Sequence, residues 1–335
     1  MVGENSYTLQ WHITHRCNLR CKHCYLDEYA KEPSISELFR IIKLIEQFLD
    51  EKDAVGEIDI TGGEPFVSPH IFSILNWLEA SQRIRDIVIG TNGTLITEKT
   101  VTQLKKYKKL RAVQISIDGN EKTHDIIRGE GNFKTSIEAI KLLSKHGIKV
   151  SVSFTANRIN YKEFDEVANI VSQAGAKVIW TDRVIPLGSP EKRDELIKNL
   201  VLTNDEFKEY LSIIHTAKQN HSEVKDKRPL QFIETDDKCG HICSAGTRLL
   251  TITADNQLMP CRRLDLYLGS LKKHSISELI EAYNFKEKRR IVDKIHITPD
   301  GCKGCKHLDY CQGGSKCLTY ATFGTFNAPD PNCLY

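Results

Sequence analysis

Residues 16–25 read Arg-Cys-Asn-Leu-Arg-Cys-Lys-His-Cys-Tyr, so that Cys17, Cys21 and Cys24 stand in the pattern C-x3-C-x2-C. Three thiolates can hold three irons of a four-iron cubane and leave the fourth iron without a protein ligand. A structural zinc site is the competing interpretation, but such a site needs four ligands. His23 is the nearest candidate, and it stands beside Cys24 with little freedom to reach around a metal. The stretch therefore favours an iron–sulfur site.

The composition excludes several classes of protein. The chain has 335 residues, a net charge of +3, 40% hydrophobic residues and 11 cysteines. This apolar fraction argues against disorder, and the small charge does not indicate nucleic-acid binding. No secretory signal or membrane-spanning run is visible, so we expect a cytoplasmic protein, in which structural disulfides are rare. Because an odd number of cysteines cannot all pair, metal or iron–sulfur ligation is the leading interpretation.

The cysteines fall into two groups, with none between residues 25 and 238. The second group is Cys239, Cys243, Cys261, Cys302, Cys305, Cys311, Cys317 and Cys333. This distribution predicts a scaffold with one site at its start and a Cys-rich C-terminal domain.

The first two-thirds of the chain alternates short runs rich in Ile and Val with helical patterns. Six strands are predicted, at residues 9–14, 57–61, 86–91, 112–117, 149–155 and 177–182. Helix start signals lie between them: a capping box at Ser34 and Glu37, an N-cap at Ser68 before Pro69, and a start at Asn160. Strands linked by helices predict an α/β fold with a parallel sheet, open or closed into a barrel.

Unusual residues follow each predicted strand, at the edge where parallel sheets collect ligands. In strand order these are Cys17, then Gly62-Gly63-Glu64-Pro65, Thr91-Asn92-Gly93, Ser116 with Asp118-Gly119, Asn157-Arg158, and Arg183. Each could be an ordinary turn, because Gly, Asn and Asp are common turn residues. Their occurrence after all six strands indicates a shared ligand site.

Together with the residues around it, Arg16 to Tyr25, the three-cysteine motif resembles the signature of the radical S-adenosylmethionine (SAM) enzymes. In that family the cysteines hold a [4Fe–4S] cluster whose unique iron binds SAM. A reducing flavodoxin or ferredoxin supplies one electron, and SAM is cleaved to methionine and a 5′-deoxyadenosyl radical that abstracts hydrogen from the substrate. The resemblance implies a partial (β/α)6 barrel.

The other strand ends are similar to that family as well. Residues 62–65 match its GGEP segment, which contacts the SAM amino group. Arg128 could pair with the SAM carboxylate, or it could form an ordinary surface salt bridge. The cofactor-binding residues that the resemblance implies are Gly62, Gly63, Glu64, Pro65, Thr91, Asn92, Ser116, Asp118, Arg128, Asn157 and Arg183.

The C-terminal part of the chain has its own pattern. A helical linker begins near residue 186, and we place the domain boundary between a core of residues 1–225 and a domain of residues 226–335. Residues 249–261 read as a hairpin, with Asn256 in a turn that needs a left-handed backbone. The spacing of the later cysteines does not by itself separate zinc from iron–sulfur ligation.

This region resembles the SPASM extension of radical SAM enzymes, which binds auxiliary clusters. Cys317 departs from the family spacing, because five residues instead of three separate it from Cys311. The family pattern implies auxiliary cluster I on Cys239, Cys243, Cys261 and Cys317, and cluster II on Cys302, Cys305, Cys311 and Cys333. Three [4Fe–4S] clusters would then use all 11 cysteines. We therefore predict against a cysteine that donates the final hydrogen atom.

SPASM-type enzymes largely modify peptides and proteins. The first hypothesis is therefore a maturase of a ribosomally made peptide that forms a crosslink, epimerises a residue or excises part of the backbone. Only 16 residues precede Cys17, so a leader peptide is expected to bind elsewhere or through a separate leader-recognition protein.

Three alternatives stay open. One is modification of haem-precursor side chains, for which His12, His15 and His241 could serve. Another is formation of formylglycine, as in anaerobic sulfatase-maturing enzymes. The third is a non-enzymatic iron–sulfur carrier or sensor. The GGEP segment argues against a carrier, since a carrier needs no SAM site.

Overall fold

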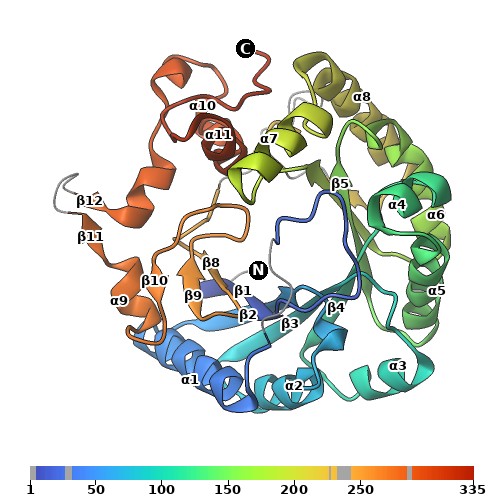
Figure 1. Ribbon diagram of the computed structural model, residues 1–335, viewed down its shortest axis with the longest axis vertical. Coiled ribbons are helices and arrows are strands. Elements are labelled where there is room, and N and C mark those ends of the chain that lie inside the picture. Colours follow the sequence, from blue (N-terminus) through green and yellow to red (C-terminus); the bar gives the residue numbers. More distant parts are fainter. Residues whose placement is uncertain (1–4, 27–31, 226–227, 232–242, 285–288) are drawn as a thin grey trace.

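The computed structural model of the chain describes residues 5–26, 32–225, 228–231, 243–284 and 289–335. Cys239 and His241 lie outside these ranges. At the centre of the described residues is one sheet of ten strands with helices around it (Figure 1). Its strand order is β10-β9-β8-β1-β2-β3-β4-β5-β6-β7, so the six N-terminal strands are neighbours in chain order.

The six predicted strands are confirmed. They are β1 (Ser6–Thr14), β2 (Val55–Gly62), β3 (Ile84–Thr91), β4 (Leu110–Ser116), β5 (Val150–Ala156) and β6 (Val178–Arg183). Each pairs in parallel with the next. Beyond β6 the sheet continues to β7 (Val224–Lys225) and not back to β1. This arrangement is the predicted partial (β/α)6 barrel.

Helices connect the parallel strands and cover the outside of the sheet. They are α1 (Ile35–Glu51), α2 (Ile71–Ala80), α3 (Glu98–Leu104), α4 (Glu121–Arg128), α5 (Asn132–Lys145) and α6 (Phe164–Gln173). The capping box at Ser34 is present, because its side chain accepts from the Glu37 N–H and the Glu37 side chain accepts in return. At the predicted start near Asn160, a 3-10 turn (Tyr161–Glu163) comes first and leads into α6.

The predicted start of α2 at Ser68 and Pro69 is wrong. A 3-10 helix, η1 (Pro65–Val67), stands just before it, and α2 begins at Ile71 with His70 as its N-cap. The Ser68 hydroxyl donates to the Glu32 carboxylate at 2.8 Å. The side chain is therefore engaged with the segment after the cysteine motif as well as with the turn into α2.

The C-terminal part continues the same sheet. Helices α7 (Pro190–Asn199) and α8 (Asn204–Asn220) lead to the predicted hairpin of β8 (Leu249–Ile252) and β9 (Gln257–Met259). Asn256 has the expected left-handed backbone, with φ at +65°. Strand β8 pairs in parallel with β1, opposite Thr8 to Trp11. The domain boundary at residue 225 stays a prediction.

Smaller elements complete the C-terminal part beside this hairpin (Figure 1). They are β10 (Gly269–Ser270), α9 (Ile276–Ile280), β11 (Tyr283–Asn284), β12 (Arg289–Arg290), the 3-10 helices Ile291–His296 and Asp300–Cys302, α10 (Leu308–Cys311) and α11 (Lys316–Phe323). The two-stranded ribbon of β11 and β12 lies apart from the main sheet. Short elements of this kind leave much of the segment as loops, which suits a region organised by thiols more than by a large core.

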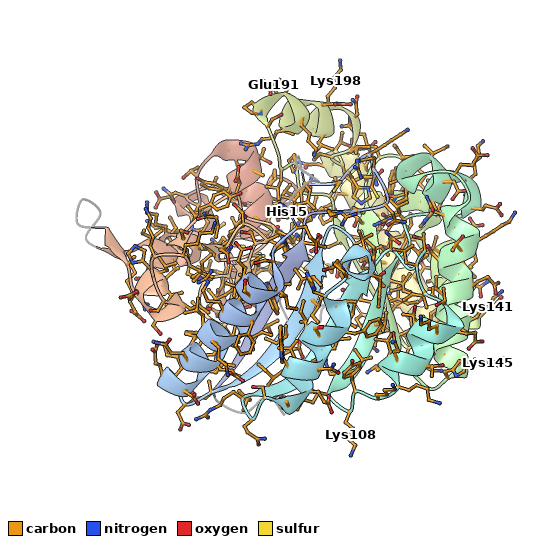
Figure 2. All side chains as sticks on the ribbon, turned by 60° about the horizontal axis from the view of Figure 1, so that its bottom comes forward. His15, Lys108, Lys141, Lys145, Glu191 and Lys198 are labelled. Carbon is orange, nitrogen blue, oxygen red and sulfur yellow. The ribbon has the colours of Figure 1, made fainter. Side chains whose placement is uncertain are left out.

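The loops that follow the parallel strands all lie at one end of the sheet. In Figure 2, Lys108, which precedes β4, lies at the lower edge of the molecule, and His15, which follows β1, lies well above it, toward the other end of the strands. Because β1 to β6 run in parallel, every loop after a strand opens on the His15 end. Ile and Leu side chains fill the space between the sheet and its helices. Within the described ranges, no helix is both long and apolar enough to cross a membrane.

Candidate functional site

A cavity of about 500 Å³ lies at the carboxyl ends of the parallel strands. Predicted site residues that line it are Cys17, Cys21, Cys24, Gly62, Gly63, Thr91, Asn92, Ser116, Arg128, Arg183, Cys243, Cys261 and Cys317. Glu64, Pro65, Asp118 and Asn157 do not line it and are buried. The cavity therefore joins the N-terminal thiols, the strand ends and part of the C-terminal thiol set.

The two glycines of the GGEP segment allow β2 to approach the segment that leads to Cys17. The Gly63 N–H donates to the Thr14 carbonyl at 2.9 Å, and the Glu64 N–H donates to the Arg16 carbonyl at 2.8 Å. A Cβ on Gly63 would stand 2.1 Å from the Arg16 carbonyl oxygen. Only glycine fits there. The glycines thus position the three-cysteine loop, in addition to any contact they make with a ligand.

Glu64 holds two neighbouring strand ends together. Its fully buried carboxylate accepts from the Thr91 hydroxyl at 2.7 Å, the Asn92 N–H at 2.8 Å and the Phe66 N–H at 3.1 Å. Burial raises the pKa of Glu64, and these hydrogen bonds oppose that rise. The loops after β2 and β3 are therefore fixed to each other by one carboxylate. The role of Glu64 toward the SAM amino group stays a prediction.

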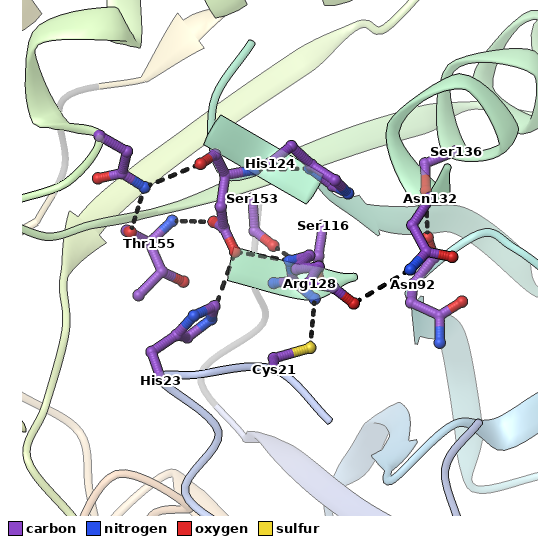
Figure 3. Close-up of polar contacts among 12 residues, drawn as sticks. Cys21, His23, Asn92, Ser116, His124, Arg128, Asn132, Ser136, Ser153 and Thr155 are labelled. Atoms are coloured by element: carbon purple, nitrogen blue, oxygen red, sulfur yellow. Dashed lines mark hydrogen bonds and ion pairs between the residues drawn. The ribbon is translucent and has the colours of Figure 1, made fainter. Parts of the chain in front are cut away.

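Asp118 is the centre of a second buried network, and Figure 3 labels its partners His23, His124, Arg128 and Thr155. Its carboxylate accepts from the Thr155 N–H at 2.7 Å and from Arg128 Nε at 2.6 Å, and it lies 3.3 Å from His23 Nε2. Its backbone N–H donates to His124 Nδ1 at 3.2 Å. Burial would raise the pKa of Asp118, but the Arg128 guanidinium and its other partners hold that pKa below the ordinary value. The group is therefore an anion.

This network reaches the cysteine motif. Arg128 Nη1 lies 3.8 Å from Cys21 Sγ, within hydrogen-bond range for sulfur, while Arg128 Nε binds Asp118 (Figure 3). His23, inside the motif, contacts the same carboxylate. Burial lowers the pKa of His23 to about 4, so its ring is neutral at pH 7. The end of α4 and the end of β4 therefore anchor the loop that carries Cys21 and Cys24.

Other predicted contact residues are held by the protein itself. Arg183 lies at the end of β6, and its Nη atoms contact both carboxylate oxygens of Asp330, at 2.7 and 2.8 Å. Asn157 donates to the Thr155 carbonyl at 3.1 Å and stays behind the cavity wall. Ser116 faces the cavity with its hydroxyl 3.4 Å from that of Ser153. Their contacts with SAM stay predictions.

The structure gathers the described cysteines into three sets. Cys17, Cys21 and Cys24 form the first set and line the strand-end cavity together. The second set is Cys243, Cys261 and Cys317, which lie in one packed cluster. The third set, Cys302, Cys305, Cys311 and Cys333, lines a separate small cavity together with His307 and Tyr335. Cys317 thus falls beside Cys243 and Cys261 in spite of its unusual spacing. Cys239, the fourth ligand in the prediction, lies outside the described residues, so cluster I stays a prediction.

The chemistry of these sets fits iron–sulfur ligation. All ten cysteines in the described ranges are free thiols. Burial raises the pKa of Cys17 and Cys311 to about 11 and of Cys243 to about 12, so these three thiols are neutral without a cation to stabilise the thiolate. Iron supplies that stabilisation on binding. Among the described residues, no three His, Cys, Asp or Glu side chains are grouped as ligands of a single metal ion.

Sequence reasoning missed several charged residues of the cavity wall. Arg228, Arg262, Arg263, Asp59 and Asp182 all line it. The sequence held a signal for three of them: Asp182 immediately precedes Arg183 at the end of β6, and Arg262 and Arg263 directly follow Cys261. Asp59 lies within β2, where a polar residue facing the interior of a parallel barrel is unexpected.

Comparison with known proteins gives a consistent result. Residues 11–171 match the model of the radical SAM superfamily, and residues 243–306 match that of an iron–sulfur cluster-binding domain, SPASM. The antilisterial bacteriocin subtilosin biosynthesis protein AlbA of Bacillus subtilis is 30% identical over 265 residues, which are 77% of this chain. The aligned region covers only 56% of the length of AlbA.

Two other similarities extend over nearly the whole chain. The AdoMet-dependent heme synthase of Methanosarcina barkeri is 25% identical over 98% of this chain and 96% of its own length. The solved structure of anSMEcpe with bound AdoMet superposes with a TM-score of 0.77 at 18% identity, covering 98% of this chain and 90% of that one. This structural similarity establishes the fold. Together with the thiol sets and the strand-end cavity, these matches show that the chain belongs to the radical SAM superfamily and is a radical SAM enzyme with a C-terminal SPASM iron–sulfur domain.

Proposed function

We propose that this enzyme is a maturase of a ribosomally made peptide. The observation that carries the proposal is the single cavity in which the Cys17 set, the strand-end residues and the Cys243 set meet. About 500 Å³ is room for a cofactor and the reacting residue of a larger substrate. The similarity to AlbA, whose name assigns it to bacteriocin biosynthesis, supports a peptide as that substrate.

Each set of site residues has a distinct role in this proposal. Cys17, Cys21 and Cys24 would hold the cluster that binds SAM, which when reduced supplies a radical able to remove a hydrogen atom from carbon. Arg128 and Asp118 would fix the cysteine loop, while Gly63 and Glu64 would fix its other side. The thiol sets of the SPASM domain would hold two auxiliary clusters that carry electrons. A flavodoxin or ferredoxin is the proposed reductant.

A haem-precursor substrate is the second candidate. The observation that favours it is the similarity to the heme synthase, which covers 96% of that protein whereas the similarity to AlbA covers 56% of AlbA. Of the histidines considered for such a substrate, His12 is buried, and burial lowers its pKa to about 3. It does not line the cavity.

Anaerobic coexpression with the peptide encoded beside the gene should produce a changed peptide. Loss of two hydrogen atoms indicates a crosslink, unchanged mass with altered stereochemistry indicates epimerisation, and a larger loss indicates excision. A variant with Cys17, Cys21 and Cys24 all replaced by alanine should leave the peptide unmodified. Unmodified peptide with the intact enzyme, together with conversion of a haem precursor, would contradict the proposal. Absence of 5′-deoxyadenosine under all conditions would also contradict catalytic activity.

Iron analysis tests the proposed number of clusters. Reconstituted enzyme should contain roughly 12 iron atoms per chain if three four-iron clusters are present. Replacing Cys302 and Cys305 by alanine should remove about four of them, because these residues belong to one set. About four iron atoms per chain in the unaltered enzyme, with zinc making up the rest, would refute two auxiliary clusters.

A further inference from the structure

The cavity wall is unusually rich in arginine. Five arginines line it, and three of them are paired inside the protein. Arg128 binds Asp118, Arg183 binds Asp330, and Arg263 binds Asp182. The remaining two are Arg228 and Arg262.

These two arginines have unused donors. In the described part of the chain, the buried Nε of Arg228 has no hydrogen-bond partner. The Arg262 guanidinium forms no hydrogen bond or ion pair with any described side chain or backbone group. Each guanidinium has five N–H donors. Both side chains are only partly buried, but the Arg228 Nε is shielded from water, and an unmatched donor there costs free energy. Unpaired guanidinium groups in a cavity indicate a site prepared for an external acceptor.

The geometry around Arg228 also restricts its position. Its guanidinium carbon lies 5.2 Å from the centre of the Trp180 ring, and Trp180 lines the same cavity. An aromatic face stabilises a cation and leaves the edge N–H groups available. Among the described residues, Arg228 therefore has this stacking contact and no carboxylate within ion-pair distance, although the Asp182 charge acts on it from farther away.

The acidic residues of the wall, Asp59 and Asp182, act on these charges from a distance, and neither forms an ion pair with Arg228 or Arg262 in the described part of the chain. Asp182 is already bound by Arg263, whose other Nη donates to the Arg183 carbonyl at 3.2 Å. Asp59 is largely buried, and burial raises its pKa, although Arg262 and Arg111 oppose the rise. Asp59 forms no ion pair with Arg228 or Arg262, so in the described part of the chain neither guanidinium has a direct carboxylate partner.

We propose that Arg228 and Arg262 form a carboxylate-binding site that holds the substrate beside the three-cysteine loop. The proposal rests on the proposed function, since it assigns the carboxylate to an acidic side chain of the peptide. Guanidinium groups bind carboxylates through paired, charge-assisted hydrogen bonds, which give orientation as well as affinity. The site would thus place the residue to be modified at a fixed distance from the Cys17 set. A porphyrin propionate has the same chemistry and is distinguished by the experiment.

The experiment measures binding to reconstituted, SAM-saturated enzyme by anaerobic equilibrium dialysis. The probes are acetyl-Gly-Glu-Gly-amide and its glutamine counterpart, with coproporphyrin III and its tetramethyl ester as the second pair. Saturating SAM prevents the probes from occupying the SAM site. We expect the glutamate peptide to bind about tenfold more tightly than the glutamine peptide. Arg228→Gln and Arg262→Gln should each abolish that difference, and Arg228→Lys should keep part of it.

Arg85→Gln is the matched control, because Arg85 pairs with Asp86 outside the cavity. It should bind all probes as the unaltered enzyme does. Equal binding of the two peptides would overturn the carboxylate site without touching the proposed function. Arginine-dependent binding of coproporphyrin alone would support the site and overturn the peptide as its substrate. If Arg262→Gln shifts an auxiliary-cluster potential and leaves probe binding unchanged, the arginine serves the neighbouring Cys261 thiolate and the proposal is wrong.

Discussion

Replacing Asp330 by alanine is expected to destabilise the enzyme by about 3–5 kcal/mol, because it removes one partner of a buried ion pair. Asp330 is 2% exposed and Arg183 is 4% exposed. The pair is bidentate, and the Arg183 guanidinium carbon lies 4.4 Å from the centre of the Phe207 ring. Without the carboxylate, the guanidinium would be left as an uncompensated charge where water cannot reach it.

The same carboxylate organises the backbone next to two proposed cluster ligands. It accepts from the Ser315 N–H at 2.8 Å and from the Asn332 N–H at 2.9 Å. Ser315 stands two residues before Cys317, and Asn332 immediately precedes Cys333. Asp330→Ala should therefore also lower the iron content of the SPASM domain, while the Cys17 set, which lies elsewhere on the scaffold, keeps its iron.

Thermal unfolding of the reconstituted enzyme measures the first effect, and the midpoint should fall by roughly 4–7 °C. Asp293→Ala is the control, because its pair with Arg290 is exposed and should contribute about 0.5 kcal/mol or less. Replacing both Arg183 and Asp330 by alanine should cost less than the sum of the single changes. A midpoint for Asp330→Ala that matches the control would show that the pair contributes no stability.

The local sequence was sufficient to predict the parallel strands and many of the residues at their ends. The alternation of Ile- and Val-rich runs with capping boxes predicted all six parallel strands, because strands buried in a parallel sheet are rich in those residues. The left-handed turn at Asn256 was likewise predictable, since few residues adopt that backbone. The strand-end residues met at one edge because parallel strands bring their carboxyl ends together.

Tertiary partners were not predictable in the same way. Strand β8 pairs with β1 although some 240 residues separate Thr8 from Leu249, and nothing in either strand specifies the other. Arg183 finds Asp330 at the far end of the chain. A single charged residue does not encode its partner, because any carboxylate of suitable geometry would satisfy it. The prediction that α2 starts at Ser68 was wrong for a related reason, because the Ser68 hydroxyl has a tertiary partner in Glu32.

The second large effect is expected at Asp118, where replacement by alanine should lower SAM cleavage about 10–100-fold and also destabilise the fold. Asp118 is fully buried and fixes Arg128, which in turn contacts Cys21 Sγ. It also contacts His23 between the second and third cysteines of the motif. Without the carboxylate, neither side chain has its anchor, and the loop that should hold the cluster loses its orientation.

Asp118→Asn separates orientation from charge, because the amide keeps an acceptor for the Thr155 N–H but removes the anion that balances Arg128. We expect the asparagine variant to retain iron at the Cys17 set and to show an altered electron paramagnetic resonance spectrum and reduction potential, since an unbalanced guanidinium would then lie beside Cys21. Glu138→Gln, at an exposed pair with Lys141, is the control and should change neither property. If both Asp118 variants cleave SAM at the normal rate with unchanged spectra, the network is only structural, and the cysteine loop must be positioned by the Gly63 and Glu64 side of the site.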